Sequence, residues 1–270
     1  MLVFPNAKIN IGLYITEKRP DGFHNLETIF YPINLTDILE FTESKDKTRF
    51  TNTGIQIIGP KKNNLVLKAY YLIKNQYKLP ELNIHLHKII PFDAGLGGGS
   101  SDAAFMLKSL NSYFNLQISD DELKKYAQQL GSDCPFFIKN NPIFAEGTGN
   151  IFSEITFDLS RYYILIVKPD IHISTKDAFF EIIPEIPEIS IKELIKLPIN
   201  SWKGKISNDF EKSVFKLYPE IKQIKDNLYR AGALYAQMSG SGSAAFGFFK
   251  REPDIQKYFT GYFTFLQKPE

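Results

Sequence analysis

The sequence predicts an α+β protein folded as two lobes. Strands and helices follow one another along the chain without the regular strand–helix–strand repeat of a parallel α/β fold. The character of the sequence changes near residue 156, after which a buried strand and a proline-containing stretch follow. A length of 270 residues suits one large domain or two modest ones. We therefore expect an N-terminal lobe over residues 1–155 and a C-terminal lobe over residues 156–270.

The strands of the N-terminal lobe are indicated by alternation of apolar and polar residues. Residues 9–15 alternate in this way and predict a first strand, and a turn signal separates it from a returning strand at 23–33. Further strands are expected at 38–42 and 82–90. The polar residues 43–53 are expected to form an exposed hairpin or loop.

Helix boundaries in the same lobe are indicated by capping residues. Asn64 is expected to cap a helix that ends before Pro80, and residues 102–110 are expected to form a second helix. The Ser119 capping box predicts the start of a third helix, and Gly131 predicts its end.

In the C-terminal lobe, three strands and one helix are predicted. The apolar run at 162–167 predicts a buried strand, and Pro219 predicts the first turn of a helix that ends near Gly232. Residues 234–238 and 244–249 are expected to form two strands around a Ser-Gly repeat.

Composition excludes several classes of protein. The chain has 32 Lys and Arg against 30 Asp and Glu, and five of the basic residues are Arg, so a nucleic-acid binder is not expected. Cys134 is the single cysteine, which rules out an intrachain disulfide and a multi-cysteine metal cage. We expect Cys134 to be a small buried residue. With no apolar run long enough to span a bilayer and no signal peptide, we expect a cytoplasmic protein.

A glycine cluster at residues 95–101, Gly-Leu-Gly-Gly-Gly-Ser-Ser, is the sharpest chemical signal. A glycine-rich turn between a strand and a helix lets backbone N–H groups approach an anion, and the helix N-terminus adds partial positive charge. No lysine follows the glycines, and the spacing does not fit the dinucleotide fingerprint. A flexible loop with a serine cap is the alternative, but phosphate binding is favoured.

Other candidate residues each have two interpretations. Asp133 could cap the next segment or be a catalytic carboxylate held at a helix junction. Lys8 and Asn10 share the polar face of the first strand, which could be a solvated edge or part of a site. The Ser-Gly repeat at 239–243 could be a tight strand turn or a second wall of an anion site. His85 and His87 share a strand face, but no third ligand is in view, so no metal site is expected.

Taken together, these segments resemble the GHMP small-molecule kinases over essentially the whole chain. Three blocks carry the match in order: Pro-Asn-Ala-Lys-Ile-Asn at 5–10, the glycine block with its flanks at 91–102, and Ser-Gly-Ser-Gly at 239–242. The resemblance implies a two-lobed α+β fold with an N-terminal lobe like a ribosomal-protein domain and a ferredoxin-like C-terminal lobe. It also implies that ATP and substrate lie in the cleft between the lobes.

The same resemblance implies roles for individual residues. ATP with Mg²⁺ would be the phosphoryl donor, and no side chain is assigned to the metal. Contacts to ATP are implied for Asn64, Lys88, Gly95, Leu96, Gly97, Gly98, Gly99, Ser100 and Ser101. Lys8 and Asp133 are implied as the catalytic pair, in which Asp133 orients or deprotonates the acceptor hydroxyl and Lys8 steadies the transferring phosphoryl group. Because a nearby cation makes a carboxylate a weaker base, positioning is the favoured description of Asp133.

Four further segments, at 19–24, 131–137, 145–149 and 174–179, resemble one branch of this family. That branch phosphorylates the 2-hydroxyl of a cytidine diphosphate derivative of methylerythritol, in the non-mevalonate isoprenoid pathway. Contacts to this small-molecule substrate are implied for Asn10, Phe23, His24, Thr175, Phe179 and Gly240. Phe23 stands where the family usually has Tyr, so a stacking face remains without the hydroxyl. Asp93 departs from the family pattern and is expected to face solvent.

Three alternatives stay open. The acceptor could be another small molecule of the family, such as homoserine or mevalonate. The chain could be a non-catalytic nucleotide-binding protein, although it keeps both Lys8 and Asp133. A nucleic-acid module is suggested only by the fold of the first lobe. We expect no nucleic-acid or membrane partner, and a monomer or weak homodimer.

Overall fold

The computed structural model describes residues 1–57 and 59–270, which divide into two compact units. The first unit comprises residues 1–7, 34–92 and 97–141, and the second comprises 8–33, 93–96 and 142–270. Each unit is assembled from separate stretches of chain, so the division at residue 155 stays a prediction.

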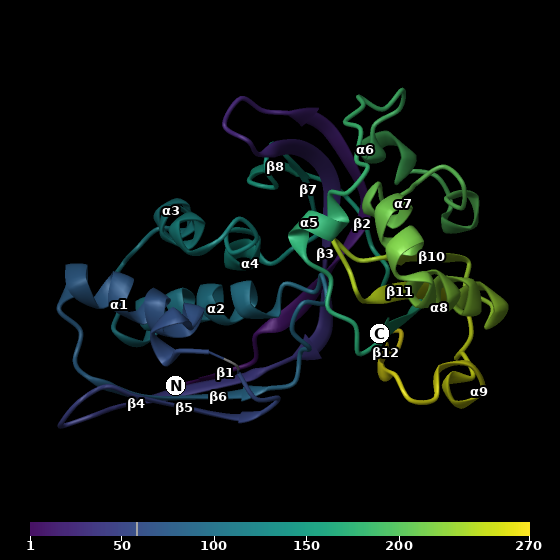
Figure 1. Cartoon of the computed structure of the whole chain (residues 1–270). Helices are drawn as coiled ribbons and strands as arrows, with labels where there is room; N and C mark the ends of the chain where they lie inside the picture. The colour runs from purple at the N-terminus through teal and green to yellow at the C-terminus, as the bar shows by residue number, and fades with distance from the viewer. Residues whose placement is uncertain (58) are drawn as a thin grey trace. The chain divides into compact units, whose positions relative to one another are not determined.

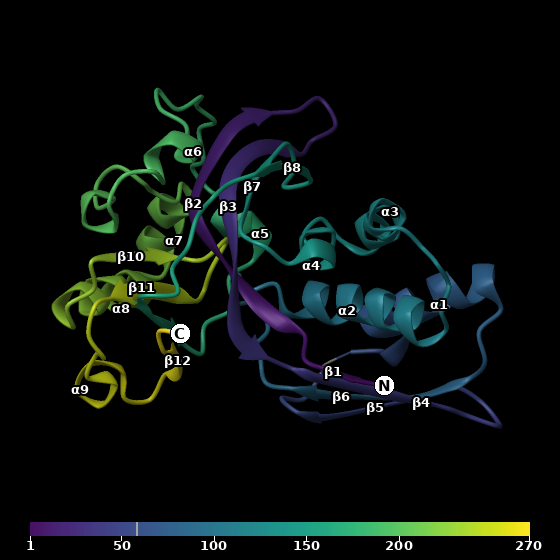
Figure 2. The same ribbon diagram turned by 180° about the vertical axis from the view of Figure 1, so that it is seen from behind.

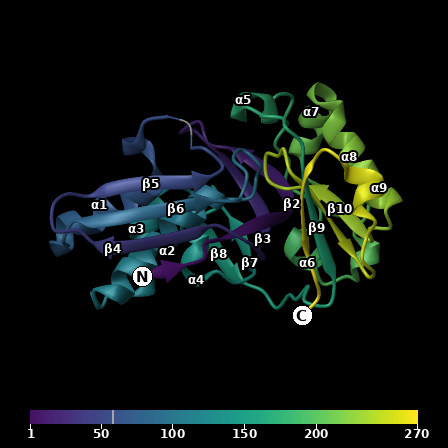
Figure 3. The same ribbon diagram turned by 90° about the horizontal axis from the view of Figure 1, so that it is seen from below.

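A four-stranded sheet forms the base of the first unit, in the order β1 (Leu2–Val3), β4 (Ile38–Glu43), β6 (Leu82–Lys88), β5 (Arg49–Gly54). Figure 3 shows β4, β6 and β5 side by side. The expectation of an exposed hairpin or loop over residues 43–53 is confirmed for 44–48, which lie outside any helix or strand, but it is wrong from Arg49 on, because β5 pairs in parallel with β6. Only Phe50 of this strand points into the core, and its polar neighbours face outward, which hid the strand in the sequence.

Helices α1 (Leu65–Tyr77) and α2 (Gly98–Tyr113) lie together on one face of this sheet (Figures 1 and 2). The short helix η1 (Lys61–Asn63) precedes α1, and α3 (Asp120–Leu130) and α4 (Phe136–Lys139) follow α2. The predicted caps are confirmed: the Asn64 side chain accepts from the Val66 N–H, and the Ser119 side chain accepts from the Glu122 N–H. The second helix begins at Gly98 and not at residue 102, because half of the glycine cluster forms its first turn.

Two sheets form most of the second unit. One has the order β2 (Asn6–Lys18), β3 (His24–Thr36), β7 (Ile143–Glu146), β8 (Ile151–Glu154), although the first residues of β2 and the last of β3 belong to the first unit. The other has the order β10 (Tyr235–Met238), β11 (Ala245–Phe249), β9 (Tyr163–Lys168), β12 (Phe263–Gln267), with every neighbouring pair antiparallel. The predicted strand pair around the Ser-Gly repeat is thus confirmed as the β10–β11 hairpin.

The helices of the second unit are mostly short: α5 (Thr175–Ala178), α6 (Ile191–Leu194), η2 (Ile199–Ser201), α7 (Phe210–Leu217), α8 (Pro219–Arg230) and α9 (Ile255–Phe259). The predicted helix at Pro219 is confirmed as α8, and its Ile224 and Leu228 pack with Leu165 and Phe249 of the β10–β12 sheet. The structure adds α7, which the sequence analysis did not predict. Sheets and helices together confirm the α+β class. No helix among the described residues is long and apolar enough to cross a membrane.

Candidate active site

The glycine block forms the N-terminus of α2. Gly97 caps the helix in a left-handed conformation, with φ of +68°, and residues 98–101 form the first turn. The first N–H groups of a helix have no partner within the helix, so they are available to an anion. A Cβ on Gly99 would meet only Leu65, at 3.8 Å, whereas one on Gly98 would lie 2.8 Å from Ile90 and from Lys88 Nζ. The turn is therefore open toward a ligand at Gly99 and closely packed beneath Gly98, which fits a phosphate group.

Beneath this turn lies a buried ion cluster that consists of Lys88, Asp37 and Asp102. All three side chains are buried, and Lys88 Nζ donates to Asp102 Oδ2 at 3.0 Å and to Asp37. Asp37 Oδ1 also accepts from the backbone N–H groups of Ile89, at 2.5 Å, and Ile90, at 2.8 Å. The cluster therefore joins the end of β6 to the first turn of α2.

Charge within this cluster favours a protonated Asp102. Burial raises the pKa of the Asp102 carboxyl to about 8. The positive charge of Lys88 acts to lower this pKa, and the negative charge of Asp37 acts to raise it. With one proton on Asp102 the cluster is neutral at pH 7, which a buried site favours. The family resemblance implied Lys88 as an ATP contact, and no motif indicated a role for either carboxylate. The available signal was Asp102 itself, an acidic residue on the buried face of a helix. The role of Lys88 toward ATP stays a prediction.

The candidate catalytic carboxylate lies close to the glycine block within the first unit. Asp133 belongs to the turn between α3 and α4 and is half-buried. The next residue, Cys134, contacts Ser100 of the first turn of α2 through its thiol, and a Cβ on Gly131 would lie 3.9 Å from Ser100 Oγ. Helix α4 begins at Phe136 with Pro135 at its cap position, so both interpretations of Asp133, as a cap of this segment and as a catalytic carboxylate, stay predictions.

Cys134 is fully buried, as predicted. Burial raises the pKa of its thiol to about 11, which keeps it protonated and unreactive near neutral pH. The residue therefore serves packing between α2 and the turn that carries Asp133.

Lys8 and Asn10 lie in the second unit, on one face of β2. The interpretation of this face as a solvated edge is wrong, because both side chains are only 3% exposed. Lys8 Nζ donates to Asn10 Oδ1 at 2.5 Å and lies 5.0 Å from the centre of the Phe30 ring. The backbone N–H of Lys8 donates to the carbonyl of Leu96 at 2.9 Å, which places the start of the glycine block beside β2.

The turn between β10 and β11 holds this part of the glycine block in place. Ser239 Oγ donates to the carbonyl of Gly95 at 2.9 Å and accepts from the N–H of Asn10 at 3.1 Å. Gly95 has φ of +70°, and a Cβ there would lie 1.9 Å from the carbonyl oxygen of Ser239. Gly240 lies against Asn10, because a Cβ on Gly240 would be 3.1 Å from Asn10 Oδ1. The structure therefore brings together Lys8, Asn10, Gly95, Leu96 and Gly240.

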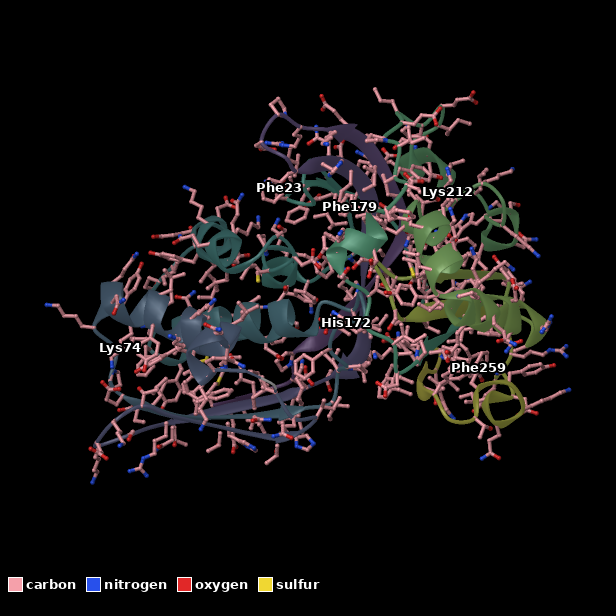
Figure 4. All side chains as sticks on the ribbon, in the orientation of Figure 1. Phe23, Lys74, His172, Phe179, Lys212 and Phe259 are labelled. Carbon is pink, nitrogen blue, oxygen red and sulfur yellow. The ribbon has the colours of Figure 1, made fainter. Side chains whose placement is uncertain are left out.

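The remaining predicted substrate contacts also lie in the second unit. His24, at the start of β3, stacks on Phe179 at the end of α5, with ring centres 4.6 Å apart. Burial lowers the pKa of His24, with a further contribution from Lys18, so its imidazole is neutral near pH 7. Phe23 is 64% exposed at the turn between β2 and β3, and Thr175 is exposed in α5. Figure 4 labels Phe23 and Phe179.

Three other sequence expectations have clear outcomes. Asp93 faces solvent, as predicted, and its carboxylate pairs with His172 at 2.9 Å. The Asn64 side chain serves as the cap of α1, so its contact to ATP stays a prediction. His85 and His87 share a face and both contact Thr53 Oγ1 of β5, at 2.9 and 2.8 Å. Within residues 1–57 and 59–270, no group of three or more His, Cys, Asp and Glu side chains is arranged to hold a metal ion.

Comparison with known families decides the family of this chain. Residues 64–141 match the GHMP kinases N terminal domain, and residues 182–259 match the GHMP kinases C terminal domain. The two matches cover more than half of the chain. The chain is a GHMP kinase. The family expectation is thereby confirmed, and the nucleic-acid alternative loses its support.

This GHMP kinase is similar over nearly its whole length to curated relatives. It is 56% identical over 260 residues to the 4-diphosphocytidyl-2-C-methyl-D-erythritol kinase of Bacteroides fragilis, with 95% of each chain covered. It is 57% identical over 255 residues to the enzyme of the same name from Bacteroides thetaiotaomicron, with 93% of each chain covered.

Solved structures agree with the family. The crystal structure of a 4-(cytidine 5'-diphospho)-2C-methyl-D-erythritol kinase matches with a TM-score of 0.75 at 29% identity, and covers 92% of this chain and 89% of its own. The mevalonate kinase of Methanococcus jannaschii matches with a TM-score of 0.68 at 17% identity over all of this chain and 98% of its own, which shows a shared fold.

Proposed function

We propose that this GHMP kinase transfers the γ-phosphoryl group of ATP to the 2-hydroxyl of 4-diphosphocytidyl-2-C-methyl-D-erythritol, in the non-mevalonate pathway to isoprenoid precursors. The observation that carries the proposal is the 56% identity, over 95% of both chains, to a curated kinase of that name. The exposed Phe23 and the stacked pair of His24 and Phe179 support a nucleobase-bearing substrate.

The ATP phosphates are proposed to bind at the N-terminus of α2. The first N–H groups of the helix and the open face at Gly99 support this placement. Family membership implies the use of ATP, and Mg²⁺ is proposed to arrive with it and to neutralise charge on the phosphate oxygens. Asn64, Lys88, Ser100 and Ser101 remain candidates for the ATP side.

Lys8 and Asp133 are proposed as the catalytic pair. Phosphoryl transfer asks a protein mainly for positioning and for stabilisation of charge on the transferring group. The ammonium of Lys8 supplies positive charge for the phosphoryl group, and the Asp133 carboxylate accepts the proton of the acceptor hydroxyl as a hydrogen bond. Their contacts support these roles, since Lys8 Nζ donates to Asn10 and Cys134, next to Asp133, contacts Ser100 of α2.

The cytosine base is proposed to stack against Phe23 and Phe179, with the His24 ring, which stacks on Phe179 in this structure, turning to the edge of the base. A neutral imidazole has one donor and one acceptor nitrogen, which suits the mixed edge of cytosine. Thr175, Asn10 and Gly240 are proposed as further substrate contacts. A cytoplasmic location and a monomer or weak homodimer stay our expectations from the sequence.

The test is ATP-dependent ADP release by the purified full chain. The acceptors are 4-diphosphocytidyl-2-C-methyl-D-erythritol, homoserine, mevalonate and none. D133N is assayed beside D170N, a matched change of an exposed aspartate with no assigned role. We expect turnover on the cytidylated acceptor alone, loss of most turnover in D133N with nucleotide binding retained, and normal turnover in D170N.

Each other outcome changes a defined part of the proposal. Turnover on homoserine or mevalonate keeps the kinase and overturns the cytidine pocket. Wild-type turnover in D133N overturns the role of Asp133. No turnover on any acceptor, with ATP still bound, favours a non-catalytic nucleotide-binding protein.

A further inference from the structure

A chain of three buried side-chain hydrogen bonds ends at the ammonium of Lys8. Lys8 Nζ donates to Asn10 Oδ1 at 2.5 Å, and Asn10 Nδ2 donates to Thr28 Oγ1 at 3.1 Å. Thr28 Oγ1 in turn donates to the backbone carbonyl of Gly12 at 2.5 Å. Thr28, on the neighbouring strand β3, is fully buried. No sequence motif and no feature of the family resemblance above assigns it a role.

The hydroxyl of Thr28 decides which way the Asn10 amide points. A threonine hydroxyl has one proton, and a carbonyl oxygen can only accept, so the proton of Thr28 is used by Gly12. Toward Asn10 the hydroxyl can therefore only accept, and only the amide nitrogen of Asn10 can donate to it. The amide oxygen is left facing Lys8. The opposite orientation would place the NH₂ group of Asn10 against the ammonium, and two donors would meet.

We propose that Thr28 is a positioning residue for Lys8, acting through the Asn10 amide. The inference rests on the proposed function, because it assumes that the ammonium of Lys8 acts on the transferring phosphoryl group. A lysine side chain has four rotatable bonds, and an acceptor held in one orientation removes much of that freedom before substrate binds. A misplacement of about 1 Å at a reacting group can cost about 100-fold in rate, so the effect should appear in kcat.

The experiment compares three full-length variants with the wild type. T28V removes the hydroxyl and keeps the shape of the side chain, whereas T28S keeps the hydroxyl. Y31F is the matched control, because Tyr31 lies on the same strand and its buried hydroxyl accepts a hydrogen bond from the Leu159 N–H at 3.1 Å, outside this network. Steady-state kcat and both KM values are measured with ATP and the cytidylated acceptor, together with nucleotide binding and thermal unfolding.

We expect kcat of T28V to fall by about 10- to 100-fold, with KM for ATP within about twofold of the wild type. T28S should restore kcat to within about threefold, since the hydroxyl alone sets the orientation of Asn10. Y31F should lower the unfolding temperature without the loss of kcat.

Several results would overturn the inference. Wild-type kcat in T28V would show that the hydroxyl is not needed. A loss in T28V that T28S does not restore would assign the effect to packing, and an equal loss in Y31F would assign it to the stability of β3. A separate variant, K8M, distinguishes the two levels of the proposal. If K8M keeps full turnover, the proposed role of Lys8 fails, whereas loss in K8M with normal T28V overturns only the role of Thr28.

Discussion

Replacing Gly95 with alanine tests whether the glycine block depends on its contact with the β10–β11 turn. Gly95 has φ of +70°, and its Cα faces the carbonyl oxygen of Ser239 so closely that a Cβ would lie 1.9 Å from it. Ser239 Oγ donates to the Gly95 carbonyl at 2.9 Å, and the N–H groups of Ser243 and Ala244 donate to the carbonyls just before it, both at 3.2 Å. On the other side, the Lys8 N–H of β2 donates to the Leu96 carbonyl at 2.9 Å. An alanine therefore strains the backbone and separates the two segments.

The expected loss follows from these contacts. A left-handed alanine costs about 1–2 kcal/mol. Separating Gly95 from Ser239 by more than about 1 Å breaks the Ser239 hydrogen bond and displaces Leu96 from the Lys8 N–H, and each lost hydrogen bond costs about 0.5–1.5 kcal/mol. The free energy of unfolding should therefore fall by about 2–5 kcal/mol. Turnover should fall more than about tenfold, since the displaced segments include the backbone of Lys8.

Urea unfolding and ADP release of G95A and G261A would check this prediction. Gly261 also has a positive φ, +89°, but a Cβ there would meet nothing within 4 Å. G261A therefore carries only the backbone strain, about 1–2 kcal/mol, and should keep wild-type turnover. Equal losses of stability in the two variants would refute the steric reasoning. Normal turnover in G95A would show that the contact does not support the reaction.

Two further predictions concern the substrate pocket and the buried ion cluster. F23A should raise KM for the cytidylated acceptor by about fivefold or more, because stacking contributes about 1–3 kcal/mol per base. The control F4A removes another exposed phenylalanine and should leave this KM unchanged. A rise confined to KM for ATP would contradict the placement of Phe23. D102N should remove a pH dependence of the free energy of unfolding. In the wild type, the folded state keeps a proton on Asp102 up to a pKa of about 8. The unfolded chain releases this proton near the ordinary pKa of an aspartate. As pH rises from 4 to 8, the free energy of unfolding of the wild type should therefore fall relative to that of D102N, by up to about 1.4 kcal/mol per pH unit. Urea unfolding of both proteins across this pH range measures the difference. A pH-independent difference would mean that Asp102 is ionised throughout, beside Lys88 and Asp37.

Local signals in the sequence predicted local structure well. Asn64, Ser119 and Pro219 mark the starts of α1, α3 and α8, because a cap or a first-turn proline acts on its own neighbours in the chain. The strand at Arg49–Gly54 was missed because its pairing with β6 joins residues about thirty positions apart. Gly98 was placed in a loop because glycine is a poor helix former, and tertiary packing overrides that preference here.

The sequence predicted the residues of the candidate site itself but not the buried residues that hold them in position. The motifs indicated Lys8, Asn10 and the glycine block, yet nothing local indicated that Lys8 and Asn10 are buried. Thr28 and Asp37 were missed because a buried polar residue is recognised by partners that the fold brings from elsewhere. Such supporting residues carry no motif of their own, since any strand or turn can supply a hydroxyl or a carboxylate.

The burial of Cys134 makes the native chain a ready background for site-specific labelling. It is the single cysteine of the sequence, and its thiol is both inaccessible and protonated near neutral pH. Cysteines introduced at exposed lysines, Lys125 in α3 of the first unit and Lys212 in α7 of the second, would then be the positions that take a maleimide dye. Energy transfer between the two dyes would follow the separation of the units as nucleotide and acceptor bind, with the unmodified protein as the blank.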